Sequence, residues 1–192
     1  MYSYIAPAEK PKIESLYDNN IFKWSSIWRN IAFRYIQVKE REFVYRYMHE
    51  ILPTKKRLAT LRIGNGSSKC TFCDSEESNI HFTYQCIYYK PVTEWFKMIL
   101  QKCCNINSSM IKILMFDISN VNRLERNTCI VLVATYITNI WIARKLELSP
   151  NVAIRFIKGK ILFNKLLHKY RLKGNFNLVF TDMYQALRHS NI

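Results

Sequence analysis

The sequence predicts an all-α fold, a helical bundle into which one short non-helical segment is inserted. Apolar residues recur at spacings of three and four along most of the chain, which is the period of helices that pack through one face. Hydrophobic residues make up 49% of the 192 residues, enough to build a core. Only four glycines and five prolines are present, which argues against a turn-rich β-sandwich and against disorder.

The N-terminal part is expected to form an arm, residues 1–20, followed by a first helix. The arm contains a short helical stretch around Lys12–Tyr17 and closes with a polar turn. The helix begins at Trp24, and its apolar residues share one face. These residues are Trp24, Ile27, Trp28 and Ile31.

The second helix is expected to run from Val38 to Ile51, with charged residues opposite an apolar face. The apolar face comprises Phe43, Val44, Tyr47 and Ile51. Pro53 ends this helix because its ring clashes with a continuing helical backbone. Thr54 is then the N-cap of a short helix that ends near Leu61. Residues 62–69, rich in glycine and serine, form a loop.

Several helices are expected beyond residue 90. Pro91 opens an amphipathic helix, and a polar linker follows at 105–109. Residues 122–147 form a long, mostly buried helix; their many β-branched side chains also suit a strand, but the length favours a helix. A basic helix begins at Pro150 and ends near Tyr170, and a final helix covers Val179–Arg188. The chain thus divides into the arm, a helical region with the insertion (21–105) and a basic helical region (106–192).

The chain carries a formal charge of +15, from 29 basic and 14 acidic residues. Such an excess predicts attraction to polyanions, nucleic acid first and acidic membrane second. The alternative is a surface that is merely solubilising. Residues 128–143 are uncharged but fall short of the ~20 apolar residues that a spanning helix needs, so we expect a core helix and no membrane partner.

Cys70, Cys73, His81 and Cys86 form the pattern C-x2-C-x7-H-x4-C. Three thiolates and an imidazole are the ligand set of a closed, tetrahedral zinc site, and a two-residue spacer suits a tight knuckle turn. Such a site leaves no position open for a substrate, so Zn²⁺ would have a structural role. The alternative is a group of free buried cysteines with an incidental histidine. The predicted fold is therefore a helical bundle with an inserted CCHC zinc knuckle.

The remaining cysteines are expected to be small buried hydrophobes rather than disulfide partners. They are Cys103, Cys104 and Cys129. The N-terminus has no apolar signal segment, so we expect a reducing nuclear or cytoplasmic location and no secretion. No hydrolase, P-loop or zinc-protease motif occurs, so we expect no catalytic residues, no enzymatic activity and no small-molecule substrate.

The order of several motifs resembles the zinc-binding region downstream of the reverse transcriptase in non-LTR (LINE-type) retrotransposon polyproteins. The motifs are WSSIWRN, EFVYRYMHEILPTKKRL, the C-x2-C…H-x4-C cluster and a helix containing EWF. The family's LPT…RL signature corresponds to Leu52, Pro53, Thr54, Arg57 and Leu58. The segment NIWIARK is similar to the family's closing Trp…Arg-Asn helix, with Lys145 in place of the usual asparagine. The resemblance covers Trp24–Lys145.

The resemblance implies a zinc-stabilised element that binds DNA or RNA. In the parent polyproteins this region helps to seat template RNA and target DNA for the reverse transcriptase. Paired catalytic aspartates are absent from the sequence, as is an endonuclease motif. We therefore expect either a separated fragment of such a polyprotein or a host gene derived from one.

Two groups of basic residues are candidates for contact with nucleic-acid phosphates. The first precedes and adjoins the cluster: Lys55, Lys56, Arg57, Arg62 and Lys69. The second lies near one face of the basic helix: Arg155, Lys158, Lys165 and Lys169. Phe72, Phe82 or Tyr84 could stack on exposed bases. The alternatives are a solvated helix end with core aromatics and, for the basic helix, a partner protein, a membrane surface or a solvated face.

The function expected from these features is non-catalytic binding of nucleic acid around a structural metal. The alternative is a protein–protein interaction adaptor, in which the same fold offers an apolar groove to a partner. Salt dependence separates the two, because contacts with several phosphates weaken steeply as salt is raised.

Overall fold

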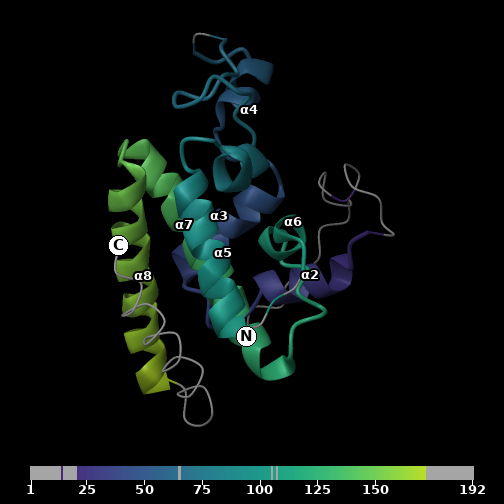
Figure 1. The fold of residues 1–192 in the computed structure, drawn as a ribbon. Helices are drawn as coiled ribbons and strands as arrows, with labels where there is room; N and C mark the ends of the chain where they lie inside the picture. Colours follow the sequence, from purple (N-terminus) through teal and green to yellow (C-terminus); the bar gives the residue numbers. More distant parts are fainter. Residues whose placement is uncertain (1–13, 15–20, 65, 105, 107, 172–192) are drawn as a thin grey trace.

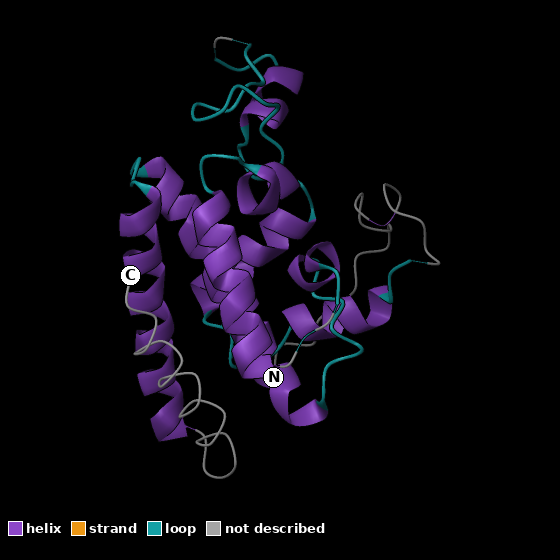
Figure 2. Ribbon diagram, viewed as in Figure 1, coloured by secondary structure: helices purple, strands orange, loops and turns teal. Residues whose placement is uncertain are grey.

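The computed structural model describes residues 14, 21–64, 66–104, 106 and 108–171, without the side chains at 123, 124 and 165–171. Most of the predicted arm and the predicted helix Val179–Arg188 lie outside these residues. The all-α prediction is confirmed: the described residues contain helices and loops and no strand (Figure 2). The elements are α2 (Trp24–Ile31), α3 (Val38–Met48), α4 (Lys55–Thr60), η1 (His81–Gln85), α5 (Lys90–Cys104), α6 (Met110–Leu114), α7 (Arg123–Lys145) and α8 (Pro150–Arg171).

Helix α7 is the centre of the bundle. It packs against α3, α5, α6, α8 and the π-helical turn η1 (Figure 1). Residues 128–137 are all buried, because a helix that is apolar on every side can only be accommodated inside the protein. The prediction of a long buried helix is thus confirmed, and the strand alternative is wrong. Among the described helices, none combines the length and apolar composition needed to cross a bilayer.

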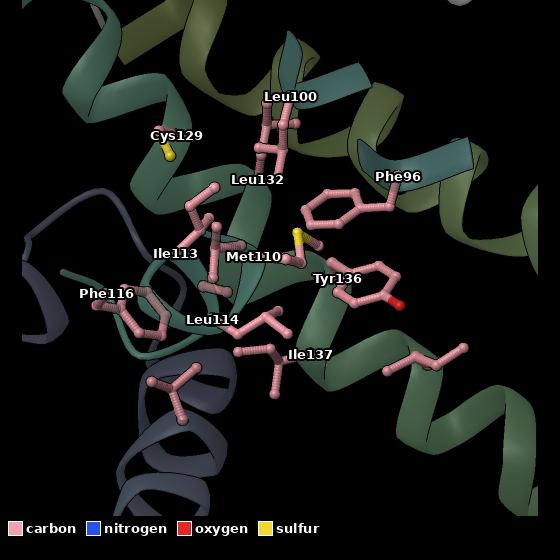
Figure 3. Packing of buried hydrophobic residues seen from close by; sticks show 14 of the residues in the cluster. Phe96, Leu100, Met110, Ile113, Leu114, Phe116, Cys129, Leu132, Tyr136 and Ile137 are labelled. Carbon is pink, nitrogen blue, oxygen red and sulfur yellow. The ribbon is translucent and has the colours of Figure 1, made fainter. Parts of the chain in front are cut away.

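The core between α5, α6 and α7 is built from interleaved aromatic and aliphatic side chains (Figure 3). The rings of Phe96 and Tyr136 stack in parallel, with centroids 3.9 Å apart and planes 3° from each other. The Tyr136 hydroxyl donates to the carbonyl of Thr83, 2.8 Å away. This buried bond joins α7 to η1, and η1 begins with one of the predicted metal ligands. One hydrophobic cluster contains residues of both predicted regions, 21–105 and 106–192.

The predicted C-terminal end of the second helix is wrong. Helix α3 ends at Met48, and Glu50 adopts a left-handed conformation with φ of 54°. The N–H of Ile51 donates to the carbonyl of Arg46 (3.0 Å) and that of Glu50 to Tyr47 (3.1 Å), which is a Schellman motif. Ile51 is 43% exposed and does not belong to the buried face. Pro53 follows a helix that has already ended.

The same ending recurs after α4, α6 and α7. The residues in the left-handed conformation are Arg62 (57°), Phe116 (60°) and Glu147 (51°), none of them a glycine. The short helix α6 was not expected from the sequence. Thr54, by contrast, is confirmed as an N-cap, since its hydroxyl accepts the N–H of Arg57 at 3.3 Å.

Helix α8 lies at the edge of the bundle, antiparallel to α7 (Figure 1). A buried polar contact holds it there: the Asn164 amide donates to the Glu40 carboxylate of α3 (3.1 Å) and to the Thr135 hydroxyl of α7 (2.7 Å). Burial raises the pKa of Glu40, although hydrogen bonds from the side chains of Asn164 and Thr135 and from the Gln37 N–H oppose that shift, as does the charge of Lys160. One side of α8 is thereby fixed against α3 and α7.

Candidate metal centre

The four predicted ligands come together in space. Their ligand atoms all lie within 4.8 Å of one another. The Cys73 sulfur lies 3.4 Å from Nε2 of His81 and 3.8 Å from the Cys86 sulfur. A tetrahedral ion with bonds of ~2.3 Å to sulfur and ~2.0 Å to nitrogen separates its ligands by about 3.8 Å (S to S) and 3.5 Å (S to N). Cys70, Cys73, His81 and Cys86 are therefore close enough to hold one metal ion.

The first two cysteines belong to a tight turn. The N–H of Cys70 donates to the carbonyl of Ser75 (2.7 Å), and the N–H of Asp74 donates to the backbone carbonyl of Cys70 (3.2 Å). Asp74 has a φ of 57°, which reverses the chain directly after Cys73. The N–H of Phe72 points at the Cys70 sulfur, 3.4 Å away. The turn therefore places a backbone N–H against one of the candidate ligand sulfurs.

The other two ligands are brought together by η1. In an α-helix, residues five apart differ by about 140° in direction, so His81 and Cys86 would point apart. In η1 the N–H of Cys86 donates to the carbonyl of His81 (2.9 Å), the i to i+5 bond of a π turn. The wider turn returns Cys86 to the side of His81. Ser78 caps the turn, since its hydroxyl accepts the N–H of His81 at 3.1 Å.

Arg144 connects this cluster to the central helix. Its guanidinium donates to the Cys70 sulfur (3.1 Å) and to the Glu77 carboxylate (3.0 Å), and it is only 5% exposed. It also lies over the rings of Phe72 (5.0 Å) and Tyr89 (5.1 Å). The sequence indicated Arg144 only as part of the segment NIWIARK, and not as a neighbour of the cluster. Its place at the penultimate position of a long buried helix was the signal that it faces inward.

The electrostatics favour bound metal. Burial raises the pKa of the Cys86 thiol, but the Tyr89 backbone N–H and the Arg144 guanidinium outweigh burial and lower it below its ordinary value. Zn²⁺ with three thiolates and a neutral imidazole carries one net negative charge, which a buried guanidinium on a ligand sulfur offsets. Arg144 thus acts on the site through Cys70 rather than as a ligand.

Several basic residues predicted to contact phosphates have partners within the protein. The Lys56 ammonium pairs with Glu76 (2.7 Å), and the Arg57 guanidinium donates to the carbonyl of Glu50 (2.9 Å). Lys55 is partly buried at the start of α4. Arg62 and Lys69 are exposed on the loop before the cluster.

The predicted basic face of α8 is helical throughout, from Pro150 to Arg171. Arg155 is exposed and Lys158 is partly exposed; for Lys165 and Lys169 the structure describes the backbone alone. At 100° per residue, these four positions fall within an arc of about 80° and span about 21 Å of the axis.

Phe82 is wrong as a base-stacking candidate. It is 1% exposed and packs against Tyr47 and Trp141, with centroids 6.0 and 5.0 Å away, because η1 turns it into the core. Phe72 is partly buried under Tyr88, whose ring stacks on it at 5.1 Å, and Tyr84 is exposed. The three cysteines outside the cluster are buried, as predicted.

Comparison of the chain with protein-family models, with curated proteins and with solved structures gave no match. The resemblance to retrotransposon zinc-binding regions therefore stays a prediction.

Proposed function

We propose that the chain is a non-catalytic nucleic-acid-binding protein stabilised by a structural Zn²⁺ ion. Cys70, Cys73, His81 and Cys86 would hold the ion, and their number leaves no coordination position for a substrate or an activated water. Cysteine thiolates and an imidazole at these separations suit Zn²⁺ better than an oxygen-preferring ion such as Mg²⁺. A nuclear or cytoplasmic location and descent from a non-LTR retrotransposon belong to the same proposal.

The observation that carries nucleic-acid binding is the composition and position of α8. Its 22 residues include six lysines and arginines and no carboxylate. The helix lies at the edge of the bundle, so the side away from α5 and α7 faces outward (Figure 1). Four basic positions spread over about 21 Å of the helix axis can reach several phosphates of a nucleic-acid strand.

Binding through α8 makes a quantitative prediction about salt. If four cations contact duplex phosphates, the logarithm of the affinity falls with the logarithm of salt with a slope near −3.6, about 100-fold between 50 and 200 mM. Fluorescence anisotropy with labelled DNA and RNA measures this slope. Changing Lys158, Lys165 and Lys169 together to glutamate should weaken binding at least tenfold and flatten the slope by about 3.

The control for that variant changes three lysines on other elements to glutamate, with the same change in net charge. Lys23, Lys97 and Lys102 are exposed and suit this purpose. If both triple variants bind equally well, α8 is not the contact surface.

Metal binding is tested separately. Elemental analysis of the purified protein should find one Zn²⁺ per chain, and Cys73→Ser should abolish it. Cys103→Ser, at a buried cysteine outside the cluster, should retain the metal. Wild-type protein that refolds fully in a chelator, with no zinc, would refute the structural role.

A protein-interaction adaptor is the second candidate, favoured by apolar residues on the outer side of α8. Val152 and Phe163 are exposed on one stripe of the helix, while Phe156 between them is partly buried against the core. Apolar docking of a partner protein is insensitive to salt, so the slope measured above distinguishes the two functions.

A further inference from the structure

A small cavity lies where the knuckle meets the C-terminal end of α7. Its volume is about 110 Å³, the space of roughly four waters and well below the ~300 Å³ at which sites for small-molecule ligands begin. Phe72 of the knuckle, Lys55 of α4 and three residues of α7 line it. The residues of α7 are Trp141, Arg144 and Lys145. A space of this size suits one planar group, not a whole cofactor.

We propose that this cavity receives one base of a single-stranded nucleic acid, which stacks on Trp141. The proposal rests on the function proposed above and names a second contact site for the same ligand, at the knuckle end of the bundle. Phe82, the candidate from the sequence, lies beneath Trp141 in the core, with ring centroids 5.0 Å apart. Trp141 itself is partly exposed.

The ring of Trp141 is covered at the cavity by a movable group. The Lys145 ammonium lies 4.8 Å from the ring centroid, and both side chains line the cavity. Lys145 is exposed, so it can swing away from the ring. Phe43 and Phe82 contact Trp141 with tilted rings and hold the indole in place. The indole is therefore fixed, while its cover is not.

Replacing the Lys145 ammonium on the ring of Trp141 by a stacked base is favourable. An exposed cation–π pair contributes about two- to fivefold to an equilibrium constant. A base stacked on an aromatic side chain contributes roughly five- to 150-fold to affinity, whatever the base. The displaced ammonium also becomes available to the phosphate that follows the base. A net gain of about tenfold in affinity follows.

The charges around the cavity suit a phosphate beside the base. The Glu77 carboxylate is paired with Arg144, 3.0 Å away. Lys55 and Lys145 approach from different elements, and Glu147 is the remaining acid in the lining. An acidic peptide would use the two lysines but leave the indole unused, so a nucleotide is the better match.

Photo-crosslinking tests the contact directly. A 12-nucleotide single strand that carries 5-iodouracil, in DNA and RNA versions, is irradiated with the full-length protein, and the crosslinked peptide is identified by mass spectrometry. We expect crosslinks to Trp141 with single strands and none with a duplex of the same sequence, whose bases remain stacked. The two versions show whether the cavity prefers DNA or RNA.

Affinity measurements test the stacking contribution. Trp141→Leu should bind single strands about tenfold more weakly, by the same factor at every salt concentration, because stacking releases no counterions. Trp141→Phe keeps an aromatic ring in the packed position and should lose at most threefold. Trp28→Leu, at a partly exposed tryptophan on α2, is the matched control and should bind like the wild type. Lys55→Gln should instead flatten the salt slope by about 0.7.

The outcomes separate this inference from the proposed function. If Trp141→Leu and Trp141→Phe both bind single strands as the wild type does, or crosslinks map only to α8, stacking in the cavity is refuted while binding through α8 stands. If Trp141→Leu fails to fold, the crosslinking experiment decides, because crosslinks to Trp141 support the inference and crosslinks to α8 alone refute it. If the wild type binds no nucleic acid, both proposals fall.

Discussion

Replacing Arg144 by methionine removes the cation that lies between the metal ligands and Glu77. The side chains of this pair are 4% and 9% exposed, and the charged atoms are 3.0 Å apart. Loss of one partner leaves a buried carboxylate without an opposite charge, which costs about 3–5 kcal/mol. The Cys70 sulfur also loses a donor 3.1 Å away. Methionine fills much of the same volume, so the loss reports on charge more than on packing.

Urea unfolding at saturating Zn²⁺ measures this cost. With an m-value of about 2 kcal/mol/M, the midpoint should fall by about 2 M. Competition with a chelator should show Zn²⁺ affinity reduced about 10- to 100-fold, as is usual when a partner of a ligand is removed. The double variant Arg144→Met with Glu77→Gln should recover part of the stability, because the carboxylate that Arg144 pairs with is removed as well.

A neighbouring ion pair provides the matched control. Lys56 and Glu76 are 2.7 Å apart, but their side chains are 53% and 54% exposed. Lys56→Met should therefore cost about 0–1 kcal/mol. If the two methionine variants lose the same stability, burial is not what makes the Arg144 pair important, and the reasoning fails.

Two further predictions concern the bundle. Tyr136→Phe keeps the stack on Phe96 but leaves the Thr83 carbonyl without its buried donor, which should lower the free energy of unfolding by about 1–2 kcal/mol in chemical denaturation. Glu40→Gln should stabilise the protein more at pH 7.5 than at pH 4.5. Burial raises the pKa of Glu40 above its ordinary 4.5, so wild-type stability falls as pH rises from 4.5 through that raised pKa. An unchanged difference between variant and wild type at the two pH values would contradict this.

The helices and the metal cluster were predictable because their signals are local. Three- and four-residue spacing is visible in any helical segment that packs on one face, and all-round apolarity marked α7 as buried. The four ligands fall within residues 70–86, so their spacing alone indicated a shared ion. The structure adds how the H-x4-C spacing works, through the π turn η1.

The helix ends and the surroundings of the cluster were not predictable in this way. Glycine is the usual sign of a left-handed helix end, but Glu50, Phe116 and Glu147 take that conformation here at a cost of about 1 kcal/mol each, which tertiary packing must offset. Arg144 contacts a cysteine 74 residues away. The sequence alone does not distinguish a buried arginine from an exposed one. The burial of Arg144 is recognised only in the structure, where Cys70 and Glu77 lie beside its guanidinium.

The packing around the cluster explains why this segment would need a metal. Helix α4 has no buried residue, and between residues 61 and 80 the described buried positions are Cys70, Glu77 and Asn79. One is a ligand and two are polar, so burial of apolar surface contributes little to the stability of this stretch. The coordination energy of Zn²⁺, on the order of 10 kcal/mol in small zinc modules, is large enough to take its place. Because Arg144 and the cavity beside Trp141 sit on the same junction, a metal there would fix both the end of α7 and the walls of the proposed base-binding site.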